Sequence, residues 1–115
     1  MTFTADEAWT LEAVRNVVKN SLEYTPDGEA LEISCEDNPL YTEISVCDSG
    51  PGIDPEDLPH LFERFYKGKN AGSSSFGIGL ALAQSIMSRQ NGVIRAENRQ
   101  GGGSRFRIRF YKQTI

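Results

Sequence analysis

Apolar and polar residues follow a helical spacing near the start of the chain and alternate, as in strands, in its middle and at its end. Residues 4–24 have the helical pattern, which stops at the turn-forming residues 25–28. Alternation then predicts strands over residues 31–35 and 44–46, joined by a turn. These two strands are expected to pair as a hairpin.

The second half of the chain continues with turns, one more long helix and two more strands. In chain order we expect a turn-rich loop at 48–55, a short helical segment at 58–66, a polar loop at 67–76, a helix at 78–90, and strands at 93–97 and 104–110. Helices with an apolar stripe cover the apolar face of a sheet, so the predicted fold class is α+β, a two-layer sandwich. Its sheet should be mixed and mostly antiparallel, with the helices on one face.

Composition narrows the class of protein. The 115 residues, with 38% hydrophobic and 24% charged side chains, suit a single soluble domain over residues 1–115. The net charge of −4 and the scattered basic residues exclude a nucleic-acid surface. Three basic residues lie close together and alternate with apolar residues: Arg105, Arg107 and Arg109. This alternation predicts that they form the solvent face of a strand.

Several other chemistries lack a signal in the sequence. No apolar run reaches the roughly 18 residues of a membrane span, and the first residues do not resemble a signal peptide. Cys35 and Cys47 are too few for a disulfide framework and lack zinc-ligand spacing. His60 is the one histidine, and an ordinary surface or packing role is expected for it.

The first helix has an apolar face, a charged face and a polar seam between them. The apolar arc contains Leu11, Val14, Val17, Val18 and Leu22. Asn16 and Asn20, one turn apart, lie on the seam, although asparagine is a poor helix former. They form either a half-exposed polar edge or a site where an amide oxygen ligates Mg²⁺, a cation that prefers oxygen.

An acidic residue ends the second strand with its side chain on the apolar side. Asp48 has the same strand parity as Ile44 and Val46. A buried carboxylate needs hydrogen-bond donors, and the amino group of adenine would be one. Gly50 and Gly52 would let a flat ring lie close to the backbone. An ordinary Asp-Gly turn is the alternative interpretation.

A pair of glycines opens the helix predicted at 78–90, in the segment Gly77-Ile78-Gly79-Leu80. Free backbone amides at a helix start form a site for an anion such as phosphate, although a flexible hinge is the alternative. Two better-known phosphate motifs do not fit. A Walker loop needs Ser or Thr after Gly-Lys, where this chain has Asn70, and a Rossmann fingerprint needs a third glycine.

Taken in order, these motifs resemble the N box, first glycine box, F box and second glycine box of bacterial sensor histidine kinases. The matching residues, within roughly residues 6–110, are Asn16 and Asn20, Asp48-x-Gly50-x-Gly52, Phe62 and Phe65, and Gly77-x-Gly79-Leu80. These kinases share the Bergerat ATP-binding fold with DNA gyrase, MutL and the ninety-kilodalton heat-shock chaperones. The resemblance therefore implies that fold.

The resemblance also implies a role for each matching residue. Asn20 would ligate Mg²⁺, Asp48 would bind the amino group of adenine, and residues 67–76 would form the ATP lid. Asn16 and Lys67, near the phosphates, would be the catalytic residues. Further nucleotide contacts are implied for Gly50, Gly52 and Ile53 at the base, for Tyr24 and Tyr66, and for Gly77, Ile78, Gly79 and Leu80 at the phosphates.

The implied activity is that of an ATP-dependent protein histidine kinase in a two-component system. The chain would bind Mg·ATP and donate the γ-phosphoryl group to a histidine on a separate dimerisation hairpin, and a response regulator would then receive it. The hairpin and the first strands of the family's domain are not found in the sequence. The chain would thus be the cytoplasmic catalytic part of a longer protein that is anchored in the bacterial membrane, with no direct membrane contact of its own.

Two other functions stay open. Glu23 stands where many such kinases carry a lysine, and Ser75-Phe76 replaces a smaller pair before the second glycine box. These two departures indicate, as one alternative, a nucleotide-sensing interaction module without transfer. A weak ATPase of the same superfamily is the other alternative. Its relatives carry a water-orienting glutamate at the position of Asn16, and an amide is not a base, so hydrolysis should be feeble.

Overall fold

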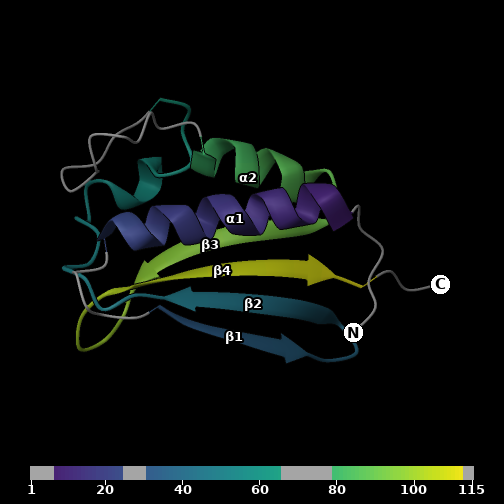
Figure 1. Cartoon of the computed structure of the whole chain (residues 1–115), viewed down its shortest axis with the longest axis horizontal. Helices are drawn as coiled ribbons and strands as arrows, with labels where there is room; N and C mark the ends of the chain where they lie inside the picture. The colour runs from purple at the N-terminus through teal and green to yellow at the C-terminus, as the bar shows by residue number, and fades with distance from the viewer. Residues whose placement is uncertain (1–6, 25–30, 66–78, 113–115) are drawn as a thin grey trace.

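The computed structural model describes residues 7–24, 31–65 and 79–112, and its elements lie close to the predicted positions. They are α1 (Glu7–Tyr24), β1 (Glu32–Asp37), β2 (Tyr41–Cys47), the 3-10 turn η1 (Leu58–His60), α2 (Gly79–Ser88), β3 (Gly92–Asn98) and β4 (Ser104–Tyr111). Figure 1 shows α1 and α2 side by side on one face of the sheet. The predicted two-layer α+β sandwich with helices on one face is therefore confirmed.

The described strands form one sheet in the order β1-β2-β4-β3. Every pair of strands in this sheet is antiparallel. The predicted sheet was mixed and mostly antiparallel, and the described strands contain no parallel pair. The register places Cys47 opposite Arg105 and Asn98 opposite Ser104. As a result, the ends of β2 and β3 and the start of β4 meet at one end of the molecule, on the left in Figure 1.

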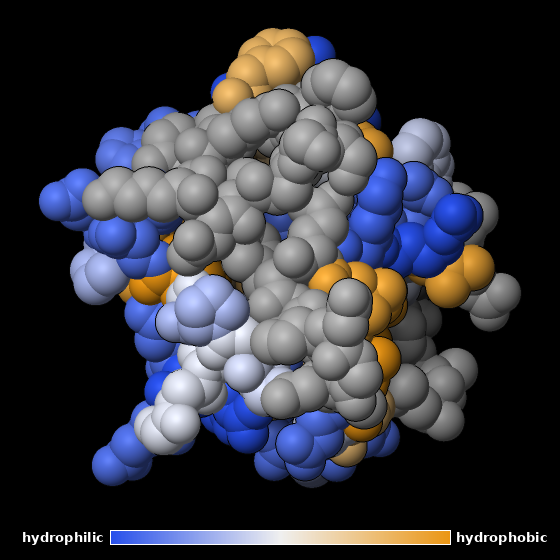
Figure 2. Space-filling view, turned by 60° about the vertical axis from the view of Figure 1, so that its left-hand side comes forward, coloured by the Kyte–Doolittle hydropathy of each residue, from blue (hydrophilic) through white to orange (hydrophobic). Residues whose placement is uncertain are grey.

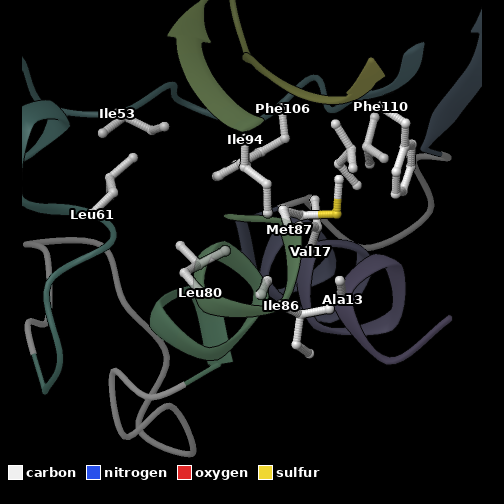
Figure 3. Packing of buried hydrophobic residues seen from close by; sticks show 13 residues of the cluster. Ala13, Val17, Ile53, Leu61, Leu80, Ile86, Met87, Ile94, Phe106 and Phe110 are labelled. Carbon is white, nitrogen blue, oxygen red and sulfur yellow. The ribbon is translucent and has the colours of Figure 1, made fainter. Parts of the chain in front are cut away.

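Between the two layers lies a core of apolar side chains from both helices and from β2, β3 and β4 (Figure 3). Phe106, Ile108 and Phe110 are at most 2% exposed, which confirms the alternation predicted for the last strand. Val17 of α1 and Met87 of α2 are fully buried in the same core. Burial of each such side chain contributes about 1.5–3 kcal/mol to stability, so this core is the main source of contact between the two layers.

The buried face of α1 differs from the predicted apolar arc. Leu11 and Leu22 are 60% and 56% exposed, so the prediction is wrong for them. Among the α1 side chains that the structure describes, those at 8% exposure or less are Thr10, Ala13, Val17 and Ser21. Because α1 packs on both the sheet and α2, small side chains fit the close contact, and the buried stripe is turned toward Asn16 and Asn20. No helix in the described ranges is long and apolar enough to cross a membrane.

The helical segment expected at 58–66 is reduced to the single turn η1. Phe65 has a left-handed backbone with φ of 67°, a conformation that a continuing helix cannot contain. Its side chain is 63% exposed. Phe62 instead packs edge to face on Phe106, with 6.4 Å between the ring centroids. Of the two F-box aromatics, only Phe62 thus contributes to the core.

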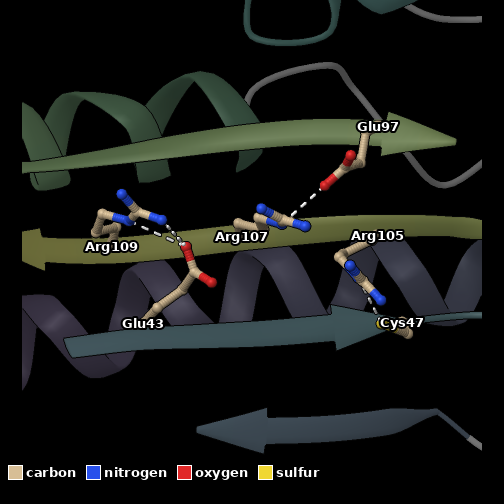
Figure 4. Close-up of polar contacts among 6 residues, drawn as sticks. All are labelled: Glu43, Cys47, Glu97, Arg105, Arg107 and Arg109. Carbon is tan, nitrogen blue, oxygen red and sulfur yellow. Dashed lines mark hydrogen bonds and ion pairs between the residues drawn. The ribbon is translucent and has the colours of Figure 1, made fainter. Parts of the chain in front are cut away.

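The sheet face opposite the helices holds the arginines that were predicted to face solvent (Figure 4). Their polar contacts join Arg109 to Glu43, Arg107 to Glu97, and Arg105 to Cys47. The Arg109 guanidinium donates two hydrogen bonds to one Glu43 oxygen, at 3.0 and 2.9 Å. The hydrogen bond to the Cys47 sulfur raises the pKa of the Arg105 guanidinium. The polar face of β4 is therefore confirmed, and its charges are largely paired within the sheet.

Candidate functional site

Asp48, the residue after β2, is 1% exposed at the end of the sheet, as its strand parity predicted. Its Oδ1 accepts hydrogen bonds from the backbone N–H groups of Gly50, at 2.9 Å, and Ser104, at 3.3 Å. The hydroxyl of Ser104 donates to Oδ2. A carboxylate has about four acceptor positions. These three bonds hold Asp48 in place and leave acceptor capacity for one more donor.

The turn between β3 and β4 packs directly against the backbone of Asp48. Gly103 has a φ of 84°, and a Cβ at this position would lie 1.9 Å from the Asp48 carbonyl oxygen. Asp48 also donates its N–H to the Ser104 carbonyl at 2.9 Å, and Arg99 donates to the Asp48 carbonyl at 3.1 Å. Sequence reasoning missed Arg99, Gly103 and Ser104. The run of glycines before the last strand is the signal that could have indicated this close approach.

The far end of the glycine loop is held by Asn98, another residue that sequence reasoning missed. The Asn98 side chain accepts from the N–H of Ile53 at 2.7 Å and donates to the Ile53 carbonyl at 2.8 Å. The Ile53 side chain is 6% exposed and belongs to the core. Gly52 has a φ of 84°, and a Cβ there would lie 3.0 Å from Asn98 Oδ1. Glycine is therefore the residue that fits at this position.

Asn16 and Asn20 lie at the edge of the buried stripe of α1, as the predicted seam requires. The Nδ2 of Asn16 and the Oδ1 of Asn20 are buried and have no hydrogen-bond partner among the described residues. Buried polar atoms without a partner are costly and uncommon, so these two need an explanation, and a bound ligand would supply one. The two free atoms have opposite character, because one is a donor and the other is an acceptor.

The start of α2 lies beside Asn16. A Cβ on Gly79 would be 3.3 Å from Asn16 Oδ1, so the small residue lets the helix start approach α1. Leu80 is 8% exposed and its side chain packs in the core, which leaves its backbone as the part that can face a ligand. The structure thus places Gly79, at the start of α2, beside Asn16. The segment that follows β2 lies at the end of the sandwich where α2 begins (Figure 1).

Other predicted site residues lie outside the described part of the chain. These are Tyr66, Lys67, Gly77, Ile78, the predicted lid at 67–76, and the side chain of Tyr24.

Figure 2 views the end of the molecule at which β2 ends and α2 begins. The described residues visible there form hydrophilic areas with smaller hydrophobic groups between them.

A family model matches almost the whole chain. Residues 5–114 fit the model of the histidine kinase-, DNA gyrase B-, and HSP90-like ATPases. This range contains every candidate site residue named above.

Sensor histidine kinases are similar to the chain both in sequence and in structure. The chain is 33% identical over 113 residues to the sensor histidine kinase YvrG of Bacillus subtilis, and this covers 96% of the chain and 20% of that protein. It is 36% identical over 106 residues to the sensor-like histidine kinase SenX3 of Mycobacterium tuberculosis, covering 90% of the chain and 26% of that protein. The mycobacterial sensor histidine kinase MprB superposes with a TM-score of 0.86 at 26% identity, covering 98% of the chain and 78% of that structure.

Proposed function

The chain belongs to the family of histidine kinase-, DNA gyrase B-, and HSP90-like ATPases, and on this premise we propose that it is the catalytic domain of a sensor histidine kinase. It binds Mg·ATP and donates the γ-phosphoryl group to a histidine on a separate dimerisation hairpin. A response regulator then takes the group from that histidine. Because ATP and response regulators are found in the cytoplasm, the domain acts on that side of the membrane.

The observation that carries this proposal is the buried carboxylate of Asp48. Its protein donors leave acceptor capacity free, and Gly50 and Gly52 have no side chains to keep a flat ring away. The exocyclic amino group of adenine supplies the missing donor. Guanine presents a carbonyl oxygen at the same place on its ring and is repelled by the carboxylate. The site therefore favours ATP over GTP.

Asn16 and Asn20 supply the chemistry that a metal-bound triphosphate needs. The free Oδ1 of Asn20 is an oxygen ligand suited to Mg²⁺, and the free Nδ2 of Asn16 is a donor suited to a phosphate oxygen. The residues present therefore fit the metal. When bound, Mg²⁺ neutralises charge on the phosphates and fixes their orientation.

The remaining contacts extend the proposal to the rest of the site. Lys67 neutralises charge beside the γ-phosphate and, with Asn16, is assigned to the catalytic group. Tyr24 and Tyr66 contact the nucleotide, and the backbone amides of residues 77–80 hold the phosphates at the start of α2. Residues 67–76 act as the lid over the bound nucleotide.

The reaction is an in-line phosphoryl transfer to an imidazole nitrogen. A bond forms between that nitrogen and the γ-phosphorus while the bond from this phosphorus to the bridging oxygen breaks, and the electron pair leaves with ADP. The domain contributes positioning and charge neutralisation. His60 is not the acceptor in this proposal. It lies in η1 on the surface, and its Nδ1 is 2.8 Å from Glu63 Oε2.

The decisive experiment mixes this chain, radiolabelled ATP and Mg²⁺ with the dimerisation hairpin of the full-length protein. We expect acid-labile, base-stable label on the hairpin and none on this chain alone. Tight ATP binding without labelled hairpin would contradict transfer and favour the nucleotide-sensing module. Steady release of phosphate without phosphohistidine would favour the weak ATPase, the reading that Asn16 argues against because an amide is not a general base.

The metal assignment has its own test in the variant Asn20→Ala. We expect it to lose about tenfold in ATP affinity with Mg²⁺ present and almost nothing in EDTA, because the lost oxygen binds the metal and not the nucleotide. Calorimetric titration under both conditions measures the difference. The control Asn16→Ala should lose affinity under both conditions, since its donor meets a phosphate. Equal losses for Asn20→Ala with and without Mg²⁺ would refute a metal role.

A further inference from the structure

Both ends of the glycine loop, residues 48–53, are held by the same pair of opposed residues. Ser104 binds Asp48 at the start of the loop, and Asn98 binds Ile53 at its end. Asn98 and Ser104 are direct partners in the register of β3 and β4. The end of one hairpin therefore sets the distance between the two ends of the loop.

Asn98 holds Ile53 as a neighbouring strand would. Its amide accepts from the backbone N–H at 2.7 Å and donates to the carbonyl at 2.8 Å, so one side chain satisfies both polar groups of the residue. Asn98 itself is exposed, so these bonds, rather than burial, explain its orientation. A Cβ on Gly52 would lie only 3.0 Å from Asn98 Oδ1, so the loop fits closely against this amide.

We propose that Asn98 is a positioning residue for the nucleobase: it fixes the Gly52–Ile53 wall of the pocket at the correct distance from the Asp48 carboxylate. This inference rests on the proposed function. Asn98 does not contact the phosphate-binding atoms of Asn16 or Asn20 in the hydrogen bonds of the described residues. Its removal should therefore weaken binding of the base and leave the phosphate end unchanged.

The test uses the variants Asn98→Ala and Asn98→Asp of the whole chain, with ATP and ADP as the titrated ligands. Asn98→Asp keeps the shape and the acceptor for the Ile53 N–H but turns the donor into an oxygen that faces the Ile53 carbonyl. We expect both variants to lose about tenfold in affinity, by the same factor for ATP and ADP. With the dimerisation hairpin added, the KM for ATP should rise by this factor while kcat stays at the wild-type value.

Asn38 gives a matched control at the opposite end of the sheet. Its Oδ1 accepts from the N–H groups of Leu40 at 2.9 Å and Tyr41 at 3.0 Å, so Asn38→Ala also removes two bonds to the backbone. This control should lower the melting temperature by about as much as Asn98→Ala does, and it should leave nucleotide affinity unchanged. Asn98→Asp guards against poor folding of the alanine variant, because it is isosteric and exposed.

The outcomes separate this inference from the function on which it rests. Wild-type affinity in both Asn98 variants, or an equal loss in Asn38→Ala, would overturn the positioning role while leaving ATP binding intact. A much larger loss for ATP than for ADP would also overturn it, because the effect would then lie at the phosphates. If the unmodified chain bound neither nucleotide, the proposed function itself would fail, and this inference with it.

Discussion

Replacing Asp48 with Asn is expected to lower the affinity for ATP at least about a hundredfold while leaving the fold intact. Asn has nearly the same size, and its oxygen can still accept from Gly50 and Ser104. Its amide nitrogen can donate to the Ser104 hydroxyl oxygen. The change removes the charge and one acceptor, so a donor now opposes the amino group of adenine. Discrimination against GTP should become weaker, because guanine offers an oxygen there.

Calorimetric titration with ATP and GTP, together with thermal unfolding without nucleotide, measures both parts of this prediction. Asp37→Asn is a suitable control, because Asp37 also binds a hydroxyl, from Thr42 at 2.7 Å, and lies at the other end of β1 and β2. It should bind ATP as the wild type does. An Asp48→Asn variant with unchanged ATP affinity would show that the buried carboxylate serves only the fold.

Replacing Gly103 with Ala is expected to lower the free energy of unfolding by at least about 3 kcal/mol. The new methyl group would lie 1.9 Å from the Asp48 carbonyl oxygen and 2.9 Å from its carbonyl carbon. Both atoms belong to the backbone, so no side chain can move aside. The turn must shift instead, and the bonds from Ser104 to the Asp48 carboxylate shift with it. ATP affinity should fall together with stability.

The same turn supplies a control that separates the close contact from the backbone conformation. Gly101 also has a positive φ, of 93°, but a Cβ there would meet nothing within 4 Å. Gly101→Ala should therefore cost only about 1 kcal/mol, from the left-handed conformation. Denaturant unfolding of both variants gives the difference. Equal destabilisation by the two substitutions would mean that the contact with Asp48 has no energetic role.

Local patterns predicted the elements and the directions of several side chains. Alternation along β4 predicts which residues face the core and which face solvent, and the parity of Asp48 predicts its burial. Side chains in a strand point to opposite faces in turn, so these predictions do not depend on what lies across the sheet. The order of the four motifs also predicted the family to which residues 5–114 belong.

Partners that are distant in the sequence were not predictable in this way. Ser104 lies 56 positions from Asp48, and Asn98 lies 45 positions from Ile53. No periodicity in the chain connects them. They meet because β4 pairs with both β2 and β3, which is a property of the whole sheet. The missed site residues are therefore those whose importance comes from a long-range contact.

The sequence by itself determined the kinds of chemical group in the candidate site. These are amides on a helix seam, a carboxylate after a strand, and glycines where no side chain covers the backbone. Only the tertiary structure decided how many hydrogen bonds each group receives from the protein. Asp48 receives three bonds from the protein, whereas Asn16 Nδ2 and Asn20 Oδ1 receive none from the described residues. Whether a polar atom has a partner depends on its neighbours in space, and those neighbours are set by how α1 packs on α2 and the sheet.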